Sequence, residues 1–109
     1  MTVAIPTSVP KVARKTVTHI FIGAQYKERY VLPGTPPAGS TVRKVFVDSG
    51  GSTIVSITGS ISGNVAYFNL ASSTLISVPD GAGFYCYLHL SDEASGREHM
   101  IAYGTTFVR

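Results

Sequence analysis

The chain has 109 residues, the length of one domain, and 44% of them are hydrophobic while 14% are charged, which argues against a disordered polypeptide. No apolar run approaches the roughly 20 residues that a membrane helix needs, so we expect no membrane contact. The single cysteine, Cys86, cannot close an internal disulfide, which excludes a disulfide-stapled module.

The formal net charge of +3 conceals an asymmetry along the chain. Up to Val47, seven basic residues accompany one acidic residue, Glu28; from Asp48 onward, two basic residues accompany five acidic ones. This pattern fits self-complementary packing, docking on an acidic partner, or charges scattered over a solvated surface. The only tight basic cluster, residues 11–15, is short, so we do not expect nucleic acid to be a partner.

Residues 1–15 hold two prolines, Pro6 and Pro10, and follow no helical or strand period. Proline removes a backbone donor and restricts φ, so this segment is predicted to be an extended N-terminal arm ahead of a domain over residues 16–109. Partner contacts on the arm are expected from three apolar side chains and from the basic cluster, namely Ile5, Val9, Lys11, Val12, Arg14 and Lys15.

After the arm, apolar and polar residues alternate with period two, and no window shows an apolar stripe at helical spacing. Glycine-containing turns separate the alternating runs. Strands are therefore predicted over residues 16–22, 25–32, 41–48, 53–58, 64–71, 75–78, 83–91, 98–103 and 105–108. The predicted fold is all-β, a two-sheet antiparallel β-sandwich of Ig-like or jelly-roll-like type.

The run 83–91 shows the alternation most clearly. One face carries apolar residues expected in the core (Phe84, Cys86, Leu88, Leu90), and the other carries Tyr85, Tyr87 and His89. On the apolar face Cys86 is predicted to be a buried hydrophobe rather than a nucleophile. Tyr85 and Tyr87 either form an interface or cover the sheet against the arm or a loop.

No catalytic or metal-binding pattern stands out. The three histidines (His19, His89, His99) show no ligand spacing, and the one adjacent carboxylate pair, Asp92 and Glu93, cannot flank a single bond. Residues 59–63 have the outer glycines of a nucleophile elbow, but Ile61 occupies the nucleophile position. We therefore expect no enzyme activity, no cofactor and no metal.

Several segments together resemble a known group of domains. These are the turn Leu32-Pro33-Gly34-Thr35 after a strand with Tyr26 and Tyr30, then Ile76–Gly81, Phe84–Leu88 and the final run Ile101–Arg109 with Gly104. Over residues 16–109 the chain resembles the small β-sandwich virion domains of tailed bacteriophages, particularly phages of actinobacteria. It departs from them in its proline-rich arm and in having no tryptophan.

The resemblance implies a non-enzymatic structural component of the virion, assembled in the bacterial cytoplasm. The leading hypothesis is a capsid decoration or stabilising protein, repeated on a lattice or as a homo-oligomer, that binds the major capsid protein through its arm and a tyrosine-bearing sheet face. Two alternatives stay open. One is a minor tail, baseplate or neck protein, and the other is a carbohydrate-binding sandwich that uses Tyr85, Tyr87 and Tyr103 as a stacking platform.

Overall fold

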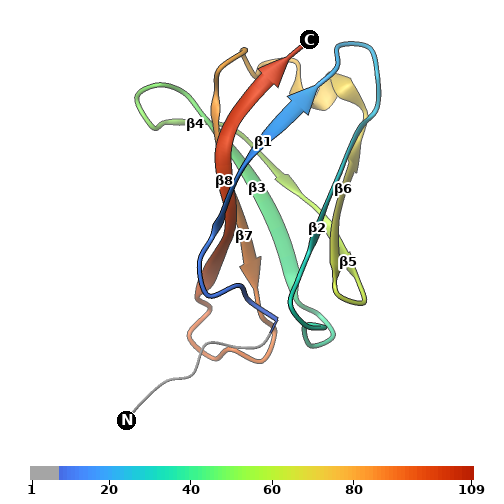
Figure 1. Ribbon diagram of the computed structural model, residues 1–109, viewed down its shortest axis with the longest axis vertical. Helices are drawn as coiled ribbons and strands as arrows, with labels where there is room; N and C mark the ends of the chain where they lie inside the picture. Colours follow the sequence, from blue (N-terminus) through green and yellow to red (C-terminus); the bar gives the residue numbers. More distant parts are fainter. Residues whose placement is uncertain (1–7) are drawn as a thin grey trace.

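The computed structural model describes residues 8–109, which form two packed β-sheets with no α-helix among them (Figure 1). The larger sheet has the order β1-β8-β7-β3-β4, and the smaller has the order β2-β6-β5. The strands are β1 (Arg14–Ile20), β2 (Tyr26–Val31), β3 (Thr41–Val47), β4 (Thr53–Thr58), β5 (Ser60–Ser62), β6 (Val65–Leu70), β7 (Gly83–His89) and β8 (Glu98–Val108). This confirms the predicted two-sheet sandwich.

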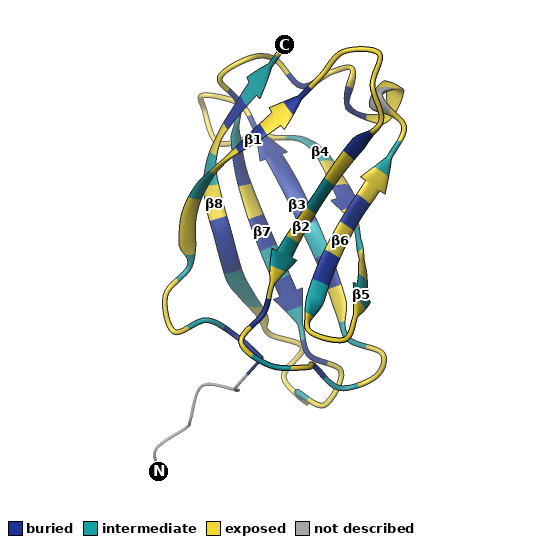
Figure 2. Ribbon diagram, turned by 45° about the vertical axis from the view of Figure 1, so that its right-hand side comes forward, coloured by how far each residue is buried: buried dark blue, intermediate teal, exposed yellow. Residues whose placement is uncertain are grey.

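The core lies between the sheets, where alternate residues of each strand point inward (Figure 2). Val42 and Phe46 of β3 and Phe84, Cys86 and Leu88 of β7 are each at most 1% exposed. The predicted core face of the run 83–91 is therefore confirmed, including the burial of Cys86. Within the described part of the chain, no helix is long and apolar enough to cross a membrane.

One pairing differs from the antiparallel expectation, because β1 runs parallel to the last strand, β8. Gly104 lies opposite Thr16 in this ladder, and a Cβ added at Gly104 would stand 1.7 Å from the Thr16 carbonyl oxygen. No real Cβ approaches an oxygen so closely, so only glycine lets β1 lie against β8 at this point. This gives a physical reason for the glycine in the final run.

Two predicted strands, 98–103 and 105–108, were wrong as separate elements, because they form the single strand β8. β8 is one continuous strand, in which a bulge at Ile101 sets Cys86 opposite Ala102 and Tyr87 opposite Met100. A bulge adds one residue to a strand, which explains why the consecutive side chains of Ile101 and Ala102 are both buried.

Two further segments differ from the sequence-based expectation. The predicted strand 75–78 is instead the end of a short 3₁₀ helix, η1 (Ser72–Leu75), and a turn that buries Leu75 and Val78. The short strand β5 was not predicted, since three residues carry too little alternation to detect.

The part of the predicted arm that the structure describes, residues 8–15, differs from a free extended arm, and residues 1–7 lie outside the described residues. β1 begins at Arg14, and Ser8 and Val9 are only 4% and 6% exposed, with Val9 in the core cluster. Ser8 and Val9 therefore pack against the sandwich, whereas Lys11 and Val12 stay exposed.

Candidate functional site

The outer face of the larger sheet carries a row of exposed side chains that the strand register sets side by side. Lys15 of β1 is opposite Tyr103 of β8, and Tyr103 is opposite Tyr85 of β7. The row ends at the buried Val45 of β3, which is opposite Tyr85. Tyr85 and Tyr103 remain 37% and 36% exposed. Because large aromatic side chains with a polar end are enriched at interfaces, this row is the leading candidate for a binding surface.

A second row on the same face holds Tyr87 in a fixed orientation. The Arg43 guanidinium lies 4.8 Å from the centre of the Tyr87 ring and forms a two-point ion pair with Glu98, with Nη2 2.7 Å from Oε1. This pairing lowers the pKa of Glu98 and raises that of Arg43. Glu98 fixes the Arg43 guanidinium, and the guanidinium in turn packs on the Tyr87 ring. The Tyr87 side chain therefore has little conformational freedom left to lose on binding.

The aromatic surface continues to one end of the face. His19 stacks on Phe107 at 5.6 Å and on Phe21 at 6.1 Å, and the Arg109 guanidinium lies 5.1 Å from the Phe107 ring. Phe21 is 56% exposed. We name the set Lys15, His19, Phe21, Arg43, Tyr85, Tyr87, Tyr103 and Phe107 the aromatic face.

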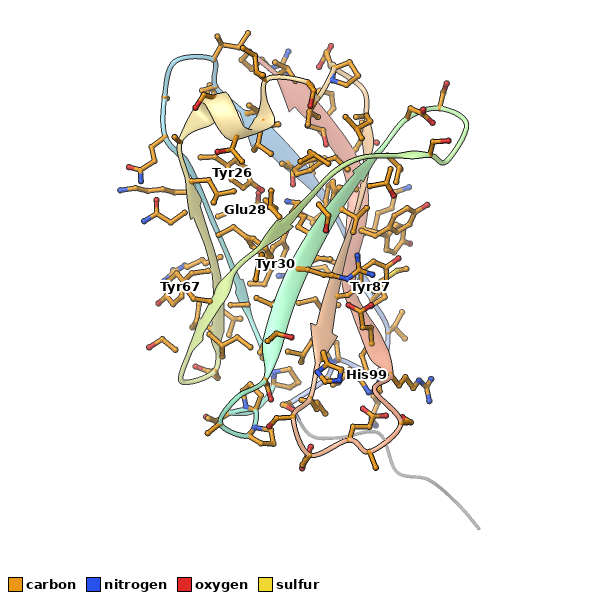
Figure 3. The ribbon with its side chains drawn as sticks, turned by 180° about the vertical axis from the view of Figure 1, so that it is seen from behind. Tyr26, Glu28, Tyr30, Tyr67, Tyr87 and His99 are labelled. Atoms are coloured by element: carbon orange, nitrogen blue, oxygen red, sulfur yellow. The ribbon has the colours of Figure 1, made fainter. Side chains whose placement is uncertain are left out.

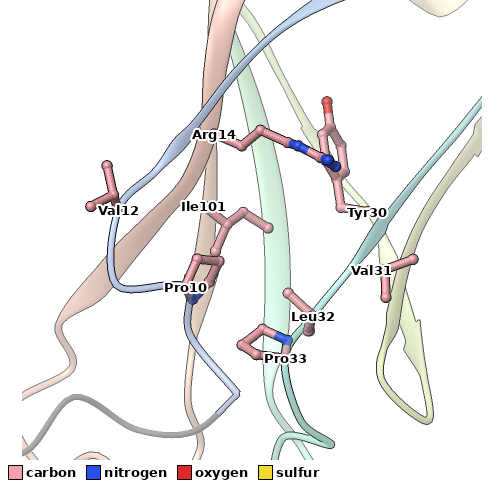
Figure 4. Close-up of a pocket in the computed structure, with 8 residues that line it drawn as sticks. All are labelled: Pro10, Val12, Arg14, Tyr30, Val31, Leu32, Pro33 and Ile101. Atoms are coloured by element: carbon pink, nitrogen blue, oxygen red, sulfur yellow. The ribbon is translucent and has the colours of Figure 1, made fainter.

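The predicted partner residues separate into distinct places. Lys15, Tyr85 and Tyr87 meet on the aromatic face, whereas Val9 is buried and cannot reach a partner from the folded domain. Lys11, Val12 and Arg14 are exposed, and Arg14 extends toward Tyr30 of β2 in a hollow away from this face (Figure 4). Ile5 lies outside the described residues.

Sequence reasoning missed a charged cluster inside the sandwich, where Tyr26, Glu28 and Tyr30 of β2 point between the sheets (Figure 3). The Lys44 side chain of β3 is fully buried. Its Nζ lies 3.0 Å from Glu28 Oε2 and 2.8 Å from both tyrosine hydroxyls, and it also donates to Thr18 Oγ1. Both tyrosine hydroxyls in turn donate to the Glu28 carboxylate.

Burial dominates the protonation chemistry of this cluster. Desolvation raises the pKa values of Tyr26 and Tyr30 strongly and lowers the pKa of Lys44, against the attraction of Glu28. Cys86, which is opposite Lys44 in the ladder, has its pKa raised to about 12 by burial. The tyrosines and the thiol therefore stay protonated at neutral pH, and the cluster joins the two sheets through a hydrogen-bonded ion pair.

Period two could have located this cluster. Glu28 shares its strand face with Tyr26 and Tyr30, and Lys44 shares its face with the apolar Val42 and Phe46. A charged residue on an apolar face requires a buried partner. Glu28 is the one carboxylate in the first half of the sequence, so it was the natural partner for Lys44.

The carboxylates and histidines do not assemble into a metal site. Within residues 8–109, no three side chains of His, Cys, Asp or Glu converge as ligands would. His99 Nε2 lies 2.6 Å from Glu93 Oε2, and His99 is at the opposite end of the sandwich from the C-terminus (Figures 1 and 3). These two side chains form a pair and not a chelate.

Comparison with known families then places the fold. A family model described as "LtfC-like, beta-sandwich domain" matches residues 16–109. The chain belongs to the LtfC-like family. LtfC is a phage-associated protein, so membership supports the expected resemblance at the level of a phage β-sandwich domain. No curated protein matches the chain significantly.

Proposed function

We propose that this LtfC-like domain is a non-enzymatic structural protein of the phage particle that decorates the capsid and binds it through the aromatic face. The aromatic face is the observation that carries the proposal. It presents exposed Tyr85 and Tyr103 beside a Tyr87 ring already held by Arg43. Pre-positioned aromatic and arginine side chains are the residues that dominate protein–protein binding energy.

The rest of the molecule supports a scaffold role. The buried Lys44–Glu28 pair joins the two sheets, and the Cys86 thiol is buried with a raised pKa. Neither group offers an accessible nucleophile. A rigid small domain repeated on a symmetric shell gains avidity from many weak contacts, and assembly would take place in the bacterial cytoplasm.

The test is co-sedimentation of the purified protein with expanded capsids, and separately with tails, of the phage that encodes it. Tyr103→Ala should weaken saturable capsid binding by at least about tenfold, as expected for an interface anchor. Tyr67→Ala is the matched control, because Tyr67 is 38% exposed but lies on the smaller sheet. Equal binding by both variants would refute docking through the aromatic face.

The same experiment separates capsid decoration from the alternatives. Binding to tails alone would instead make the protein a minor tail, baseplate or neck component. A carbohydrate-binding role is supported by the neighbouring tyrosine rings, with Tyr85 and Tyr87 6.4 Å apart. Saturable binding to a glycan array that Tyr87→Ala abolishes, without binding to either particle, would favour that role.

A further inference from the structure

A second surface lies where the sandwich is open, between the edge strands β1 and β2. Two hollows adjoin it, separated by the contact of Thr18 with Glu28. The lower hollow, of about 510 Å³, is bordered by Val12, Arg14 and Val31 (Figure 4), and the upper hollow, of about 310 Å³, is bordered by Val17 and Phe21. We call the two strand edges and these hollows the open seam.

Both edges of the open seam carry unpaired backbone groups. Ile22 N–H donates to the Arg109 carbonyl and Arg109 N–H donates to the Ile20 carbonyl, so the even-numbered residues of β1 bond toward β8. The peptide groups of Lys15, Val17 and His19 therefore point toward the open side, and no strand among the described residues pairs with them. Leu32 N–H donates to Asn64, which by the same alternation leaves the peptide groups of Lys27, Arg29 and Val31 on the open side of β2.

The open seam is also strongly basic. Four exposed cations lie on its two edge strands, and none of them forms an ion pair with a carboxylate of the described chain (Arg14, Lys15, Lys27, Arg29). The one carboxylate in the seam, Glu28, is already paired with Lys44. The seam therefore carries uncompensated positive charge next to exposed apolar side chains such as Val12 and Val31, which are 81% and 63% exposed.

The protein's own acidic residues do not match this surface. Asp48 caps its turn by accepting from Gly50 and Ser52, and Asp80 accepts from Val108. Glu93 and Glu98 are paired with His99 and Arg43. Among the described acidic residues outside the seam, only Asp92 is exposed without a side-chain hydrogen bond or ion pair, so a second copy of the chain offers the seam a single uncommitted carboxylate.

We propose that the open seam binds an acidic, extended segment of a partner protein, which adds as a strand to the free edge of β1. Backbone pairing with Lys15, Val17 and His19 would supply affinity, and acidic side chains would meet the cations. The inference goes beyond the proposed function, because it concerns the backbone edge of β1 and not the outer sheet face, although Lys15, His19 and Phe21 border both. It holds whichever particle component the aromatic face contacts.

The test uses fluorescently labelled peptides about ten residues long, which span a strand, with Glu alternating with Thr or with Val. We expect saturable binding that weakens with salt, and no binding of the Lys/Thr counterpart. In hydrogen-exchange NMR, the amides of Lys15, Val17 and His19 should exchange fast in the free protein and become protected with peptide bound. Binding without that protection, or no binding of either acidic peptide, would overturn the proposal.

Two variants separate the contributions of charge and backbone. The double variant Lys27→Glu with Arg29→Glu should weaken binding by at least about tenfold. The control Arg97→Glu should change binding little, because Arg97 lies in the loop between β7 and β8 and on neither edge strand of the seam. Val17→Pro removes the central edge donor and should abolish binding, while Val17→Ala keeps that donor and should bind nearly as well.

Three other outcomes would refute binding of an acidic segment at the seam, two by identifying a different occupant and one by identifying a different site. A DNA oligonucleotide that binds more tightly than the peptides and protects none of the three amides would make the seam a polyanion surface. Protection of the amides without peptide, accompanied by dimers in sedimentation, would show pairing between copies. Loss of peptide binding in Tyr103→Ala but not in Val17→Pro would move the site to the aromatic face.

Discussion

Lys44 and Glu28 meet between the two sheets, with the ammonium nitrogen 3.0 Å from a carboxylate oxygen and the lysine side chain fully buried. The lysine is also held over the Phe84 ring, 4.2 Å from its centre. A charge in this position is tolerated only because the partner carboxylate and neighbouring hydroxyls replace its hydration. The pair therefore sets how the small sheet sits on the large one.

Removal of one member of this pair should be costly. In Lys44→Met the Glu28 carboxylate and two tyrosine hydroxyls lose their common partner, so we expect the free energy of unfolding to fall by about 3–5 kcal/mol. The double variant Lys44→Met with Glu28→Gln should recover a large part of that loss. Urea titrations give both values, with Arg43→Met as the exposed control, and an equal loss in the single and double variants would contradict a coupled pair.

Stability should decline at alkaline pH because buried groups around Lys44 have raised pKa values. Burial raises the pKa of Cys86 to about 12, whereas the unfolded thiol ionises near 9.0. Between these values the folded state keeps a proton that the unfolded state has lost, so the free energy of unfolding falls as pH rises, by up to about 1.4 kcal/mol per pH unit for one group.

The other groups of the cluster modify this decline. The raised pKa values of Tyr26 and Tyr30 act in the same direction above pH 10.0, and the lowered pKa of Lys44 acts in the opposite direction below 10.5. Denaturation measured from pH 8 to 11 should therefore show a shallower decline in Cys86→Ala than in the parent protein. Parallel curves would mean that the thiol is not the first group to respond.

Thr18 and Thr106 should respond oppositely to the same substitution. They are opposite one another in the β1–β8 ladder and both are at most 1% exposed. The Thr18 hydroxyl contacts Lys44 and Glu28, whereas the Thr106 hydroxyl has no partner among the described residues. Valine has nearly the shape of threonine, so the substitution removes only the hydroxyl. We expect Thr18→Val to lower the free energy of unfolding by about 1–3 kcal/mol and Thr106→Val to raise it by about 0.5–1 kcal/mol. Thermal unfolding of the two variants checks the opposite signs.

Gly104→Ala should disrupt the pairing of β1 with β8. The added methyl group would overlap the Thr16 carbonyl, and a backbone atom cannot yield without moving the strand. We expect a loss of at least about 3 kcal/mol, beyond the effect of an ordinary surface substitution. The control is Gly50→Ala, where the nearest atom is the Asp48 carboxylate at 3.4 Å and the loss should stay below about 0.5 kcal/mol. Similar melting temperatures for the two variants would refute the close approach.

The sequence by itself determined the sheet class, the core and the outward direction of Tyr85 and Tyr87. All three follow from period-two alternation, which is local, because successive side chains of any strand point to opposite faces. The same reasoning failed where local pattern was weak or altered: in the 3₁₀ turn at Leu75, and at the Ile101 bulge, which shifts the register by one residue.

Only the tertiary structure decided which strands are neighbours. Pairing between β1 and β8 joins residues at opposite ends of the chain, and it alone places Lys15 beside Tyr103. Sheet stacking likewise brings Glu28 to Lys44: the alternation places each side chain on the inward face of its strand, but only the packing of the two sheets sets the contact between them. Such contacts depend on the order of strands and on the packing of two sheets, which no spacing within one strand specifies.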